Sequence, residues 1–296
     1  MNQLAPIALT TYSRLNHLKR TVAALQKNQL ARQSELYVFS DGPRAGDEEA
    51  VEELRAYLRT IDGFKFVQII ERPTNGRVAN NRGGMKWLLD RYTKVVWLAD
   101  DNVTAPGFLR FMNDALAFYE HDEDIFSISG YCPPIKIPDH YRGDIFVLPR
   151  FCAWGIGLYR RTFEVINQPI DKVEFDRVKH QRIFDVAGND VMPMVEKEVA
   201  GELQAGDVRC MYHQLLHNKY TVYPRHSLVQ NIGFDGSGEH CGETDRFHHE
   251  KLWEKCSGFQ FDKSPEMNED IRKANCKFRS GGWKSRIRTI LCRLWR

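Results

Sequence analysis

Hydrophobic and polar residues alternate between two periods along the first half of the chain. Short, almost wholly apolar runs are each followed by a stretch in which apolar residues return every three or four positions. The first kind of run predicts a buried strand, and the second predicts an amphipathic helix. The expected strands are 6–12, 35–42, 64–72, 94–101 and 125–131, and the expected helices are 14–28, 47–60, 78–92 and 106–120.

Strands that alternate with helices in this way predict an α/β fold, in which a mixed, mostly parallel sheet carries helices on both faces. The pattern is less regular in the second half. We expect a strand running into a short helix over 150–164 and a helix over 206–220. Residues 168–205 show no clear period, so the sequence predicts no element there.

No repeat or low-complexity run divides the chain, and we therefore expect a single catalytic domain over residues 1–265. A soft boundary near 130–150 separates a first half (1–130) from a second half (131–265). The last residues, 266–296, differ in composition and form a tail.

The chain has 296 residues, of which 42% are hydrophobic, which suffices for a sizeable core. Its seven cysteines are odd in number and form no C-x-x-C pair, which argues against structural zinc or a disulfide framework. The N-terminus lacks the basic and apolar regions of a signal peptide. No apolar run reaches the ~18 residues of a spanning helix. We expect a protein of the reducing cytoplasm.

The formal net charge is only +3, so the composition does not call for nucleic acid as a partner. The tail is different, because residues 272–296 carry nine Lys or Arg and no Asp or Glu. The tail therefore has a formal charge of +9, and the rest of the chain has a net charge of −6. A basic amphipathic helix of this kind predicts binding to an anionic membrane surface. The alternative is a helix packed on the domain with a solvated basic face. The apolar residues at helical spacing are Trp283, Ile287, Ile290, Leu291, Leu294 and Trp295.

Polar side chains follow three of the expected strands: Tyr12, Asp41 and the pair Asp100–Asp101. Ligands of open α/β sheets bind beyond the carboxyl ends of the strands, so these groups indicate a site. Two adjacent carboxylates repel each other and need a positive partner. Mn²⁺ or Mg²⁺ bridging to a diphosphate is one candidate. Otherwise the acids cap the next helix or pair with arginines, although Thr104 is also placed to cap that helix.

The segments around these strand ends resemble GT-A glycosyltransferases, whose fold is a Rossmann-like nucleotide-diphospho-sugar domain. "VVWLADDNVTAPGFLRFM" is similar to the acidic metal-binding region of the N-acetylglucosaminyltransferase I type. "PIALTTYSRLNHLKRTVAAL" and "LYVFSDGPR" resemble the first two strands of that domain. "RFCAWGIGLYRRTFE" and "YPRHSLVQNIGFDGSGEHC" resemble bacterial family 2-like sugar transferases. The resemblance covers roughly residues 5–245.

The resemblance implies roles on the donor side. Asp101 matches the metal-ligating acid, and Asp100 matches the acid that touches the sugar or ribose. Ala99 stands where the family has a further acid, so one such contact is missing here. Asp41 matches the residue that accepts a hydrogen bond from uracil N3–H. Further nucleotide or diphosphate contacts fall on Thr10, Tyr12, Arg14, Arg77 and Asn81.

An inverting transfer needs a carboxylate to take the proton of the acceptor hydroxyl. The resemblance implies Asp207, in "AGDVR", although Gly206 and Val208 depart from the family's acid and tryptophan. A helix N-terminus should lower the pKa of Asp207 and keep it ionised. The alternatives are that Asp190 is the base, or that Asp207 is only a first-turn or N-cap acid.

Two further positions have candidate roles. His240 matches a C-terminal histidine that reaches the metal or diphosphate in the family, with Glu239 as an alternative. Trp154, followed by Gly155 and Gly157, is placed to form a floor under the donor sugar, since glycine lets backbone approach a ligand. A buried aromatic with tight packing is the other interpretation.

These features together predict a metal-dependent, inverting glycosyltransferase in bacterial surface polysaccharide synthesis. The first half would bind the nucleotide sugar, with UDP the expected nucleotide. The second would bind a glycan or lipid-linked acceptor at the inner face of the cell membrane. A sugar-phosphate nucleotidyltransferase is an alternative, but "TTYSRLNHLKR" lacks the glycine-rich phosphate loop which that chemistry requires. A non-catalytic glycan- or nucleotide-binding protein is the third possibility.

Overall fold

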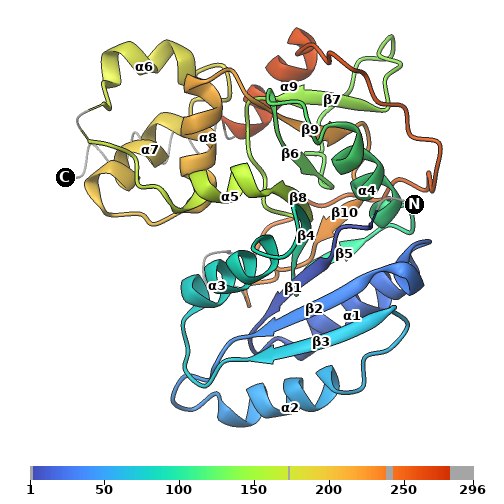
Figure 1. The fold of residues 1–296 in the computed structure, drawn as a ribbon. Helices are drawn as coiled ribbons and strands as arrows, with labels where there is room; N and C mark the ends of the chain where they lie inside the picture. The colour runs from blue at the N-terminus through green and yellow to red at the C-terminus, as the bar shows by residue number, and fades with distance from the viewer. Residues whose placement is uncertain (1–2, 173, 238–242, 281–296) are drawn as a thin grey trace.

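The computed structural model describes residues 3–172, 174–237 and 243–280, and Figure 1 shows their arrangement. The strands are β1 (Ile7–Thr11), β2 (Glu35–Ser40), β3 (Phe66–Glu71), β4 (Lys94–Ala99), β5 (Asn102–Thr104), β6 (Ile125–Ser129), β7 (Ile145–Leu148), β8 (Ile156–Tyr159), β9 (Tyr220–Pro224) and β10 (Val229–Asn231). The helices are α1 (Leu15–Gln26), the 3₁₀ turn η1 (Ala31–Gln33), α2 (Glu48–Leu58), α3 (Arg77–Leu89), α4 (Phe108–Phe118), α5 (Arg160–Asn167), α6 (Arg177–Phe184), α7 (Val191–Ala200), α8 (Gly206–Leu216) and α9 (Glu269–Arg279).

Eight strands form one sheet in the order β3-β2-β1-β4-β8-β6-β9-β7, and β10 pairs with β5 in a second, two-stranded sheet. Strands β3, β2, β1 and β4 are parallel to one another. Strand β8 runs antiparallel between β4 and β6, β9 is parallel to β6, and β7 is antiparallel to β9. The expected α/β fold with a mixed, mostly parallel sheet is confirmed.

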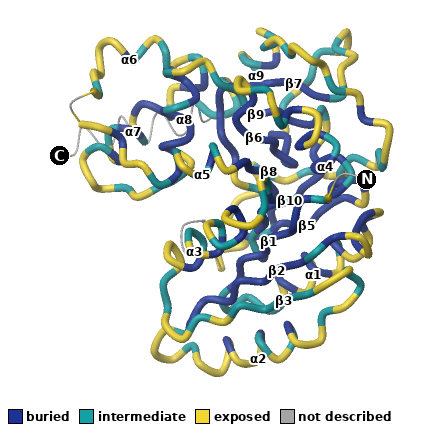
Figure 2. Tube along the Cα trace, in the orientation of Figure 1, coloured by how far each residue is buried: buried dark blue, intermediate teal, exposed yellow. Residues whose placement is uncertain are grey.

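Side chains of successive strand residues point to opposite faces of the large sheet, which gives two apolar cores. Ile7 and Leu9 of β1 join the core that includes residues of α1, α2 and α4. Ala8, between them, joins the core that includes residues of α3, α5, α7 and α8. Figure 2 shows most strands of both halves as the buried interior of the molecule, whereas the edge strand β3 is only partly buried. The uniformly apolar strands are thus explained by burial on both faces.

The second half contains elements that the sequence pattern did not predict. Helices α6 and α7 lie within 168–205, where no element was expected. The Asp176 side chain caps the first of them by accepting from the backbone N–H groups of Val178 and Lys179. The expected cap at Thr104 is wrong, because Thr104 lies in β5 and its hydroxyl accepts a hydrogen bond from Asn28 Nδ2 at 3.0 Å.

Helix α9 forms part of the tail expected at 266–296. Its Ile271 and Asn275 side chains are buried, so this helix packs on the protein. Residues 281–296, with most of the proposed membrane-binding positions, lie outside the described residues. Within the part of the chain that is described, no helix has the length and apolar character needed to cross a membrane.

Candidate nucleotide-sugar site

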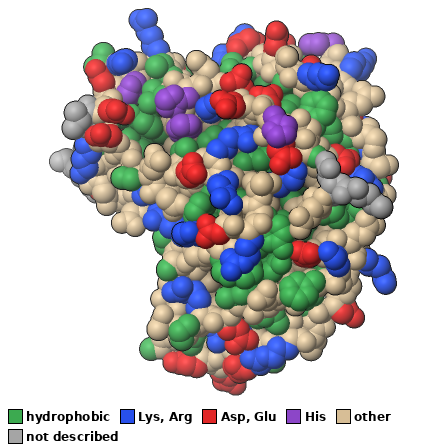
Figure 3. Space-filling model, in the orientation of Figure 1, with side chains coloured by type: hydrophobic (Ala, Val, Ile, Leu, Met, Phe, Trp, Pro, Cys, Tyr) green, Lys and Arg blue, Asp and Glu red, His purple; other side chains and the backbone are tan. Residues whose placement is uncertain are grey.

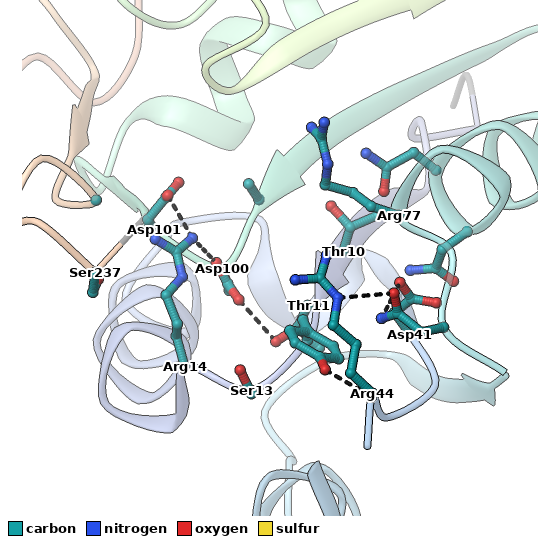
Figure 4. A pocket seen from close by; sticks show the side chains of 16 residues that line it. Thr10, Thr11, Ser13, Arg14, Asp41, Arg44, Arg77, Asp100, Asp101 and Ser237 are labelled. Carbon is teal, nitrogen blue, oxygen red and sulfur yellow. Dashed lines mark hydrogen bonds and ion pairs between the residues drawn. The ribbon is translucent and has the colours of Figure 1, made fainter. Parts of the chain in front are cut away.

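A pocket of about 490 Å³ opens where β1, β2 and β4 end, and Figure 4 shows it from close by. Parallel strands present their carboxyl ends at one edge of the sheet, and the first turn of α3 completes the wall. The structure therefore brings together eight of the residues singled out in the sequence. They are Thr10, Tyr12, Arg14, Asp41, Arg77, Asn81, Asp100 and Asp101.

The positive partner of the two adjacent aspartates is Arg14. One guanidinium nitrogen of Arg14 donates to Asp100 Oδ1 and, at 2.6 Å, to Asp101 Oδ2. Burial raises the pKa of Asp100 despite Arg14, while the two carboxylates raise the pKa of Arg14 even though burial opposes them. Asp100 also accepts from the Thr11 hydroxyl at 3.1 Å, and Asp101 accepts from Asn102 at 2.8 Å. The arginine pairing considered for the Asp–Asp motif is thus present.

The two carboxylates also fit a divalent cation in their chemistry. Mg²⁺ and Mn²⁺ prefer hard oxygen ligands and often take one or two carboxylates together with substrate phosphates and water. Among the described residues, no group of three or more His, Cys, Asp and Glu is arranged to hold a metal. A cation at Asp100 and Asp101 would therefore need phosphate oxygens as further ligands, and Arg14 would have to move away from the carboxylates.

The residues just before the glycine-rich segment contact Asp101 directly. The backbone N–H of Ile232 donates to the Asp101 carbonyl at 2.9 Å. A Cβ on Gly233 would lie 2.3 Å from Asp101 Oδ2, so only glycine fits beside this carboxylate. His240 and Glu239 lie outside the described residues, and a role for them at the metal stays a prediction.

Asp41 is almost wholly buried and organises the turn that precedes α3. Its carboxylate accepts from the backbone N–H groups of Gly42 and Gly76, each at 3.0 Å, and from Asn75 Nδ2 at 3.3 Å. Arg72 Nε also lies 3.5 Å from Asp41 Oδ1, so protein groups already surround the roughly four acceptor sites of this carboxylate. The predicted hydrogen bond from a uracil N3–H stays a prediction.

Arg44 is a pocket residue that the sequence analysis did not select. Its Nε donates to Asn75 Oδ1 at 3.2 Å, and its guanidinium lies 5.8 Å from the centre of the Tyr12 ring. The Tyr12 hydroxyl donates to Asp47 and accepts from the backbone N–H of Arg44 at 2.9 Å. The sequence signal for Arg44 was its position just after the end of the second expected strand, in "SDGPR".

Asp207 lies in the first turn of α8, outside the pocket wall but close to it. Its side chain is accessible to solvent, yet desolvation by the surrounding protein raises its pKa, while Arg150 and Arg77 act in the opposite direction. The expectation of a lowered pKa is wrong, because burial outweighs the backbone N–H groups of the helix N-terminus.

The alternative base, Asp190, is held by another side chain. Arg150 donates to its two carboxylate oxygens at 3.0 and 2.6 Å and also binds the Ala187 carbonyl at 3.0 Å. A bidentate ion pair of this kind stabilises the ionised acid and occupies its oxygens. This contact favours Asp207 over Asp190 as a proton acceptor.

Trp154 does not line the pocket. Its ring is half-buried and packs edge-on against Tyr131, Phe234 and Phe247, with ring centres 4.7 to 5.3 Å apart. Gly157 lies where a Cβ would contact Met112 at 3.0 Å, so α4 can approach β8 closely. These contacts agree with the alternative interpretation, in which Trp154 is a packed aromatic side chain and the glycines allow tight packing. Contact of Trp154 with the donor sugar stays a prediction.

A buried ion pair sets the start of α8 and thus the position of Asp207. Glu198 Oε1 accepts from Arg209 Nε at 2.6 Å, and its other oxygen accepts from the backbone N–H of Ala205 at 2.8 Å. We expect Glu198→Ala to reduce the free energy of unfolding by about 3–5 kcal/mol, since Arg209 would stay buried without its partner. Urea denaturation measures this loss.

The matched control is Glu196→Ala on the same helix. Glu196 pairs with Arg177 at 2.8 Å, but the side chains are 37% and 66% exposed. Exposed ion pairs contribute roughly 0–1 kcal/mol, so this variant should unfold almost like the unaltered protein. Equal losses for the two variants would contradict a special role of the Glu198–Arg209 pair.

Comparison with known proteins gives distant structural matches. No protein-family model matches the chain, and no curated protein matches it. Mannosyltransferase PcManGT from Pyrobaculum calidifontis, in complex with GDP-Man and Mn²⁺, is 13% identical over 71% of this chain and 69% of its own, with a TM-score of 0.39. S. aureus TarS is 11% identical over 78% of this chain but only 37% of its own, with a TM-score of 0.42. S. aureus TarS 1-349 in complex with UDP-GlcNAc is 16% identical over 47% of this chain and 36% of its own, with a TM-score of 0.32. We therefore argue function from the residues of the site.

Proposed function

We propose that this protein is a metal-dependent, inverting GT-A glycosyltransferase. It transfers a sugar from a nucleotide diphosphate, with UDP the expected nucleotide, to a hydroxyl of a glycan or a lipid-linked oligosaccharide. The acceptor would belong to a bacterial surface polysaccharide and would be met at the inner face of the cell membrane. The basic C-terminal tail would bind the anionic lipids there.

One observation carries this proposal: Asp41, Arg77 and the Asp100–Asp101 pair line the same pocket, and Asp207 is accessible beside it. A nucleotide sugar needs a polar cradle for its base, cations for its diphosphate and an acid–base group near its sugar. Figure 4 shows Arg77 on the α3 side of the pocket and Asp101 on the side of the strand ends.

Asp207 would act as the general base. Its carboxylate takes the proton from the acceptor hydroxyl while that oxygen forms a bond to C1 of the sugar and the bond from C1 to the diphosphate oxygen breaks. The transition state resembles an oxocarbenium ion. Attack from the face opposite the diphosphate inverts the configuration at C1.

The diphosphate leaves with additional negative charge, and the chain offers groups to neutralise it. Asp101, with Asp100 beside it, would hold Mn²⁺ or Mg²⁺, which when bound supplies Lewis-acid stabilisation of the leaving group. Arg77 lines the same pocket and would add a guanidinium to the diphosphate. Arg14, released from the aspartates by the cation, would be free to contact the nucleotide.

The test is calorimetric titration of the protein with UDP-, GDP-, CMP- and dTDP-sugars, each with and without Mn²⁺. We expect one nucleotide to bind, and to bind more tightly with the metal. Slow release of free sugar from that donor, followed by NMR, would report transfer to water and the configuration of the product. If no nucleotide sugar binds under either condition, the proposed function is wrong.

A further inference from the structure

Arg279, the last residue of α9, is a partly buried cation. Its Nε is buried and makes no hydrogen bond within the described part of the chain. Burial lowers the pKa of its guanidinium, and the nearby Arg150 adds to that effect. The described residues provide no carboxylate in an ion pair with it, and its guanidinium lies 5.5 Å from the centre of the Phe278 ring. Buried cations are nearly always paired, so this one calls for an anion.

A second guanidinium lies close by. A Cβ built on Gly188 would be 3.5 Å from Arg279 Cβ and 3.3 Å from a terminal nitrogen of Arg150. Arg150 is nine-tenths or more buried and already holds Asp190. Two arginines therefore share one paired carboxylate, and the neighbourhood keeps an excess of positive charge. Figure 3 shows basic and acidic side chains interspersed across the middle of the visible face.

Two neutral side chains near the arginines also have a buried atom that makes no hydrogen bond within the described residues. The Tyr131 hydroxyl and His249 Nε2 are buried and make no hydrogen bond to other described residues. The two rings lie 5.4 Å apart, and Tyr131 interacts electrostatically with Arg279. Buried polar groups in folded proteins are normally satisfied, so a cluster of three such atoms indicates a place for a polar ligand.

Asp207 has electrostatic neighbours both in the nucleotide pocket and in this cluster. Asp207 interacts with Arg77 of the pocket and also with Arg150. Cys152 lies within electrostatic reach of Arg150, Arg279 and Asp207, which connects the arginine pair to the candidate base. An acceptor whose hydroxyl reaches Asp207 would therefore come close to these arginines.

We propose that Arg279, Arg150 and Tyr131 form an anion-binding site for the acceptor, which would carry a phosphate or carboxylate close to the hydroxyl that receives the sugar. This inference rests on the proposed function for the identity of its ligand. The site itself is defined by three buried atoms that make no hydrogen bond to other described residues: Arg279 Nε, the Tyr131 hydroxyl oxygen and His249 Nε2. It makes an acidic or phosphorylated sugar the substrate class to test first.

The experiment titrates inorganic phosphate into the full-length protein, followed by ³¹P NMR line broadening, with and without a saturating concentration of UDP. Saturable binding should persist when UDP fills the nucleotide pocket. Arg279→Gln should weaken phosphate binding about 10- to 100-fold, as expected for the loss of a hydrogen-bonded charge. Lys277→Gln is the matched control, because it removes one exposed charge from the same helix and should leave binding unchanged.

Each outcome is decisive. Displacement of phosphate by UDP would assign the anion to the donor's own diphosphate and overturn the second site, as would equal losses in the two variants or no binding at all. If Arg279→Gln fails to fold, Tyr131→Phe decides: weaker binding supports the site and unchanged binding overturns it. Arg279-dependent phosphate binding in a protein that binds no nucleotide sugar would refute the proposed function and keep the anion site.

Discussion

Replacing Asp207 with asparagine is expected to slow turnover of the nucleotide sugar by about 10²- to 10⁴-fold, the usual contribution of a positioned general base. The amide has almost the shape of the carboxylate but cannot take the proton of the attacking hydroxyl. Donor affinity should stay the same, because Asp207 lies outside the wall of the nucleotide pocket. Calorimetry of the donor and the rate of sugar release or transfer together measure the two effects.

The control is Glu202→Gln, the same chemical change at an exposed position in the segment before α8. It should leave both binding and turnover unaltered. Full turnover by Asp207→Asn would exclude Asp207 as the base, and a loss of donor binding would instead indicate a disturbed pocket.

The pH dependence gives an independent check on Asp207. Desolvation raises the pKa of this carboxyl, so the acid becomes protonated at a higher pH than an ordinary aspartate. A base is inactive when protonated, and the rate should therefore fall on the acid side at a pH above the usual aspartate range near 3.9. Asp207→Asn should lose this acid limb, since the group that titrates is gone.

The second large effect is expected for Asp101→Ala. This variant should bind the nucleotide sugar more than about 100-fold more weakly in the presence of Mn²⁺, because even loss of groups that only orient metal ligands costs roughly 10- to 100-fold. Without metal, the variant and the unaltered protein should bind the donor similarly. Calorimetric titrations at several Mn²⁺ concentrations separate these cases.

Asp139→Ala, at an exposed aspartate, is the control for Asp101→Ala. It should keep the full effect of Mn²⁺. If Asp101→Ala responds to Mn²⁺ as strongly as the unaltered protein, the aspartates serve only to hold Arg14. The salt bridges of Arg14 would then be the purpose of the Asp–Asp motif.

The first half of the fold was predictable because each of its elements is defined by local sequence. In α1, Leu18, Val22 and Leu25 are all buried, as their spacing predicts. Helix α7 was missed for a physical reason: one of its buried positions is Glu198, which pairs with Arg209. A buried acid interrupts the apolar period, and its partner lies eleven residues away on another helix.

The short strands β5 and β10 could not be read from the sequence. Each has three residues, and each exists only because it pairs with the other, more than a hundred positions away. Strands this short have no hydrophobic pattern of their own that could be recognised in the sequence.

The candidate site was predictable where it follows from topology. Residues after three parallel strands meet at one edge of the sheet, and the sequence shows which residues those are. The partner of Asp100 and Asp101 was not predictable, since an arginine two residues beyond Tyr12 reaches them only in the folded chain. The direction of the Asp207 pKa shift was also missed, because it depends on how much protein surrounds the carboxylate.

The position of β8 has a consequence for protein engineering. This strand comes from the second half of the chain, but it hydrogen-bonds to β4 of the first half through the register Lys94↔Tyr159 to Trp97↔Ile156. A chimera that exchanges the second halves of two such chains must therefore rebuild a strand interface in the middle of the sheet, and compatibility of the paired residues matters more than the linker at the junction. Libraries that seek new acceptors should keep β4 and β8 from the same parent and vary the segments beyond them.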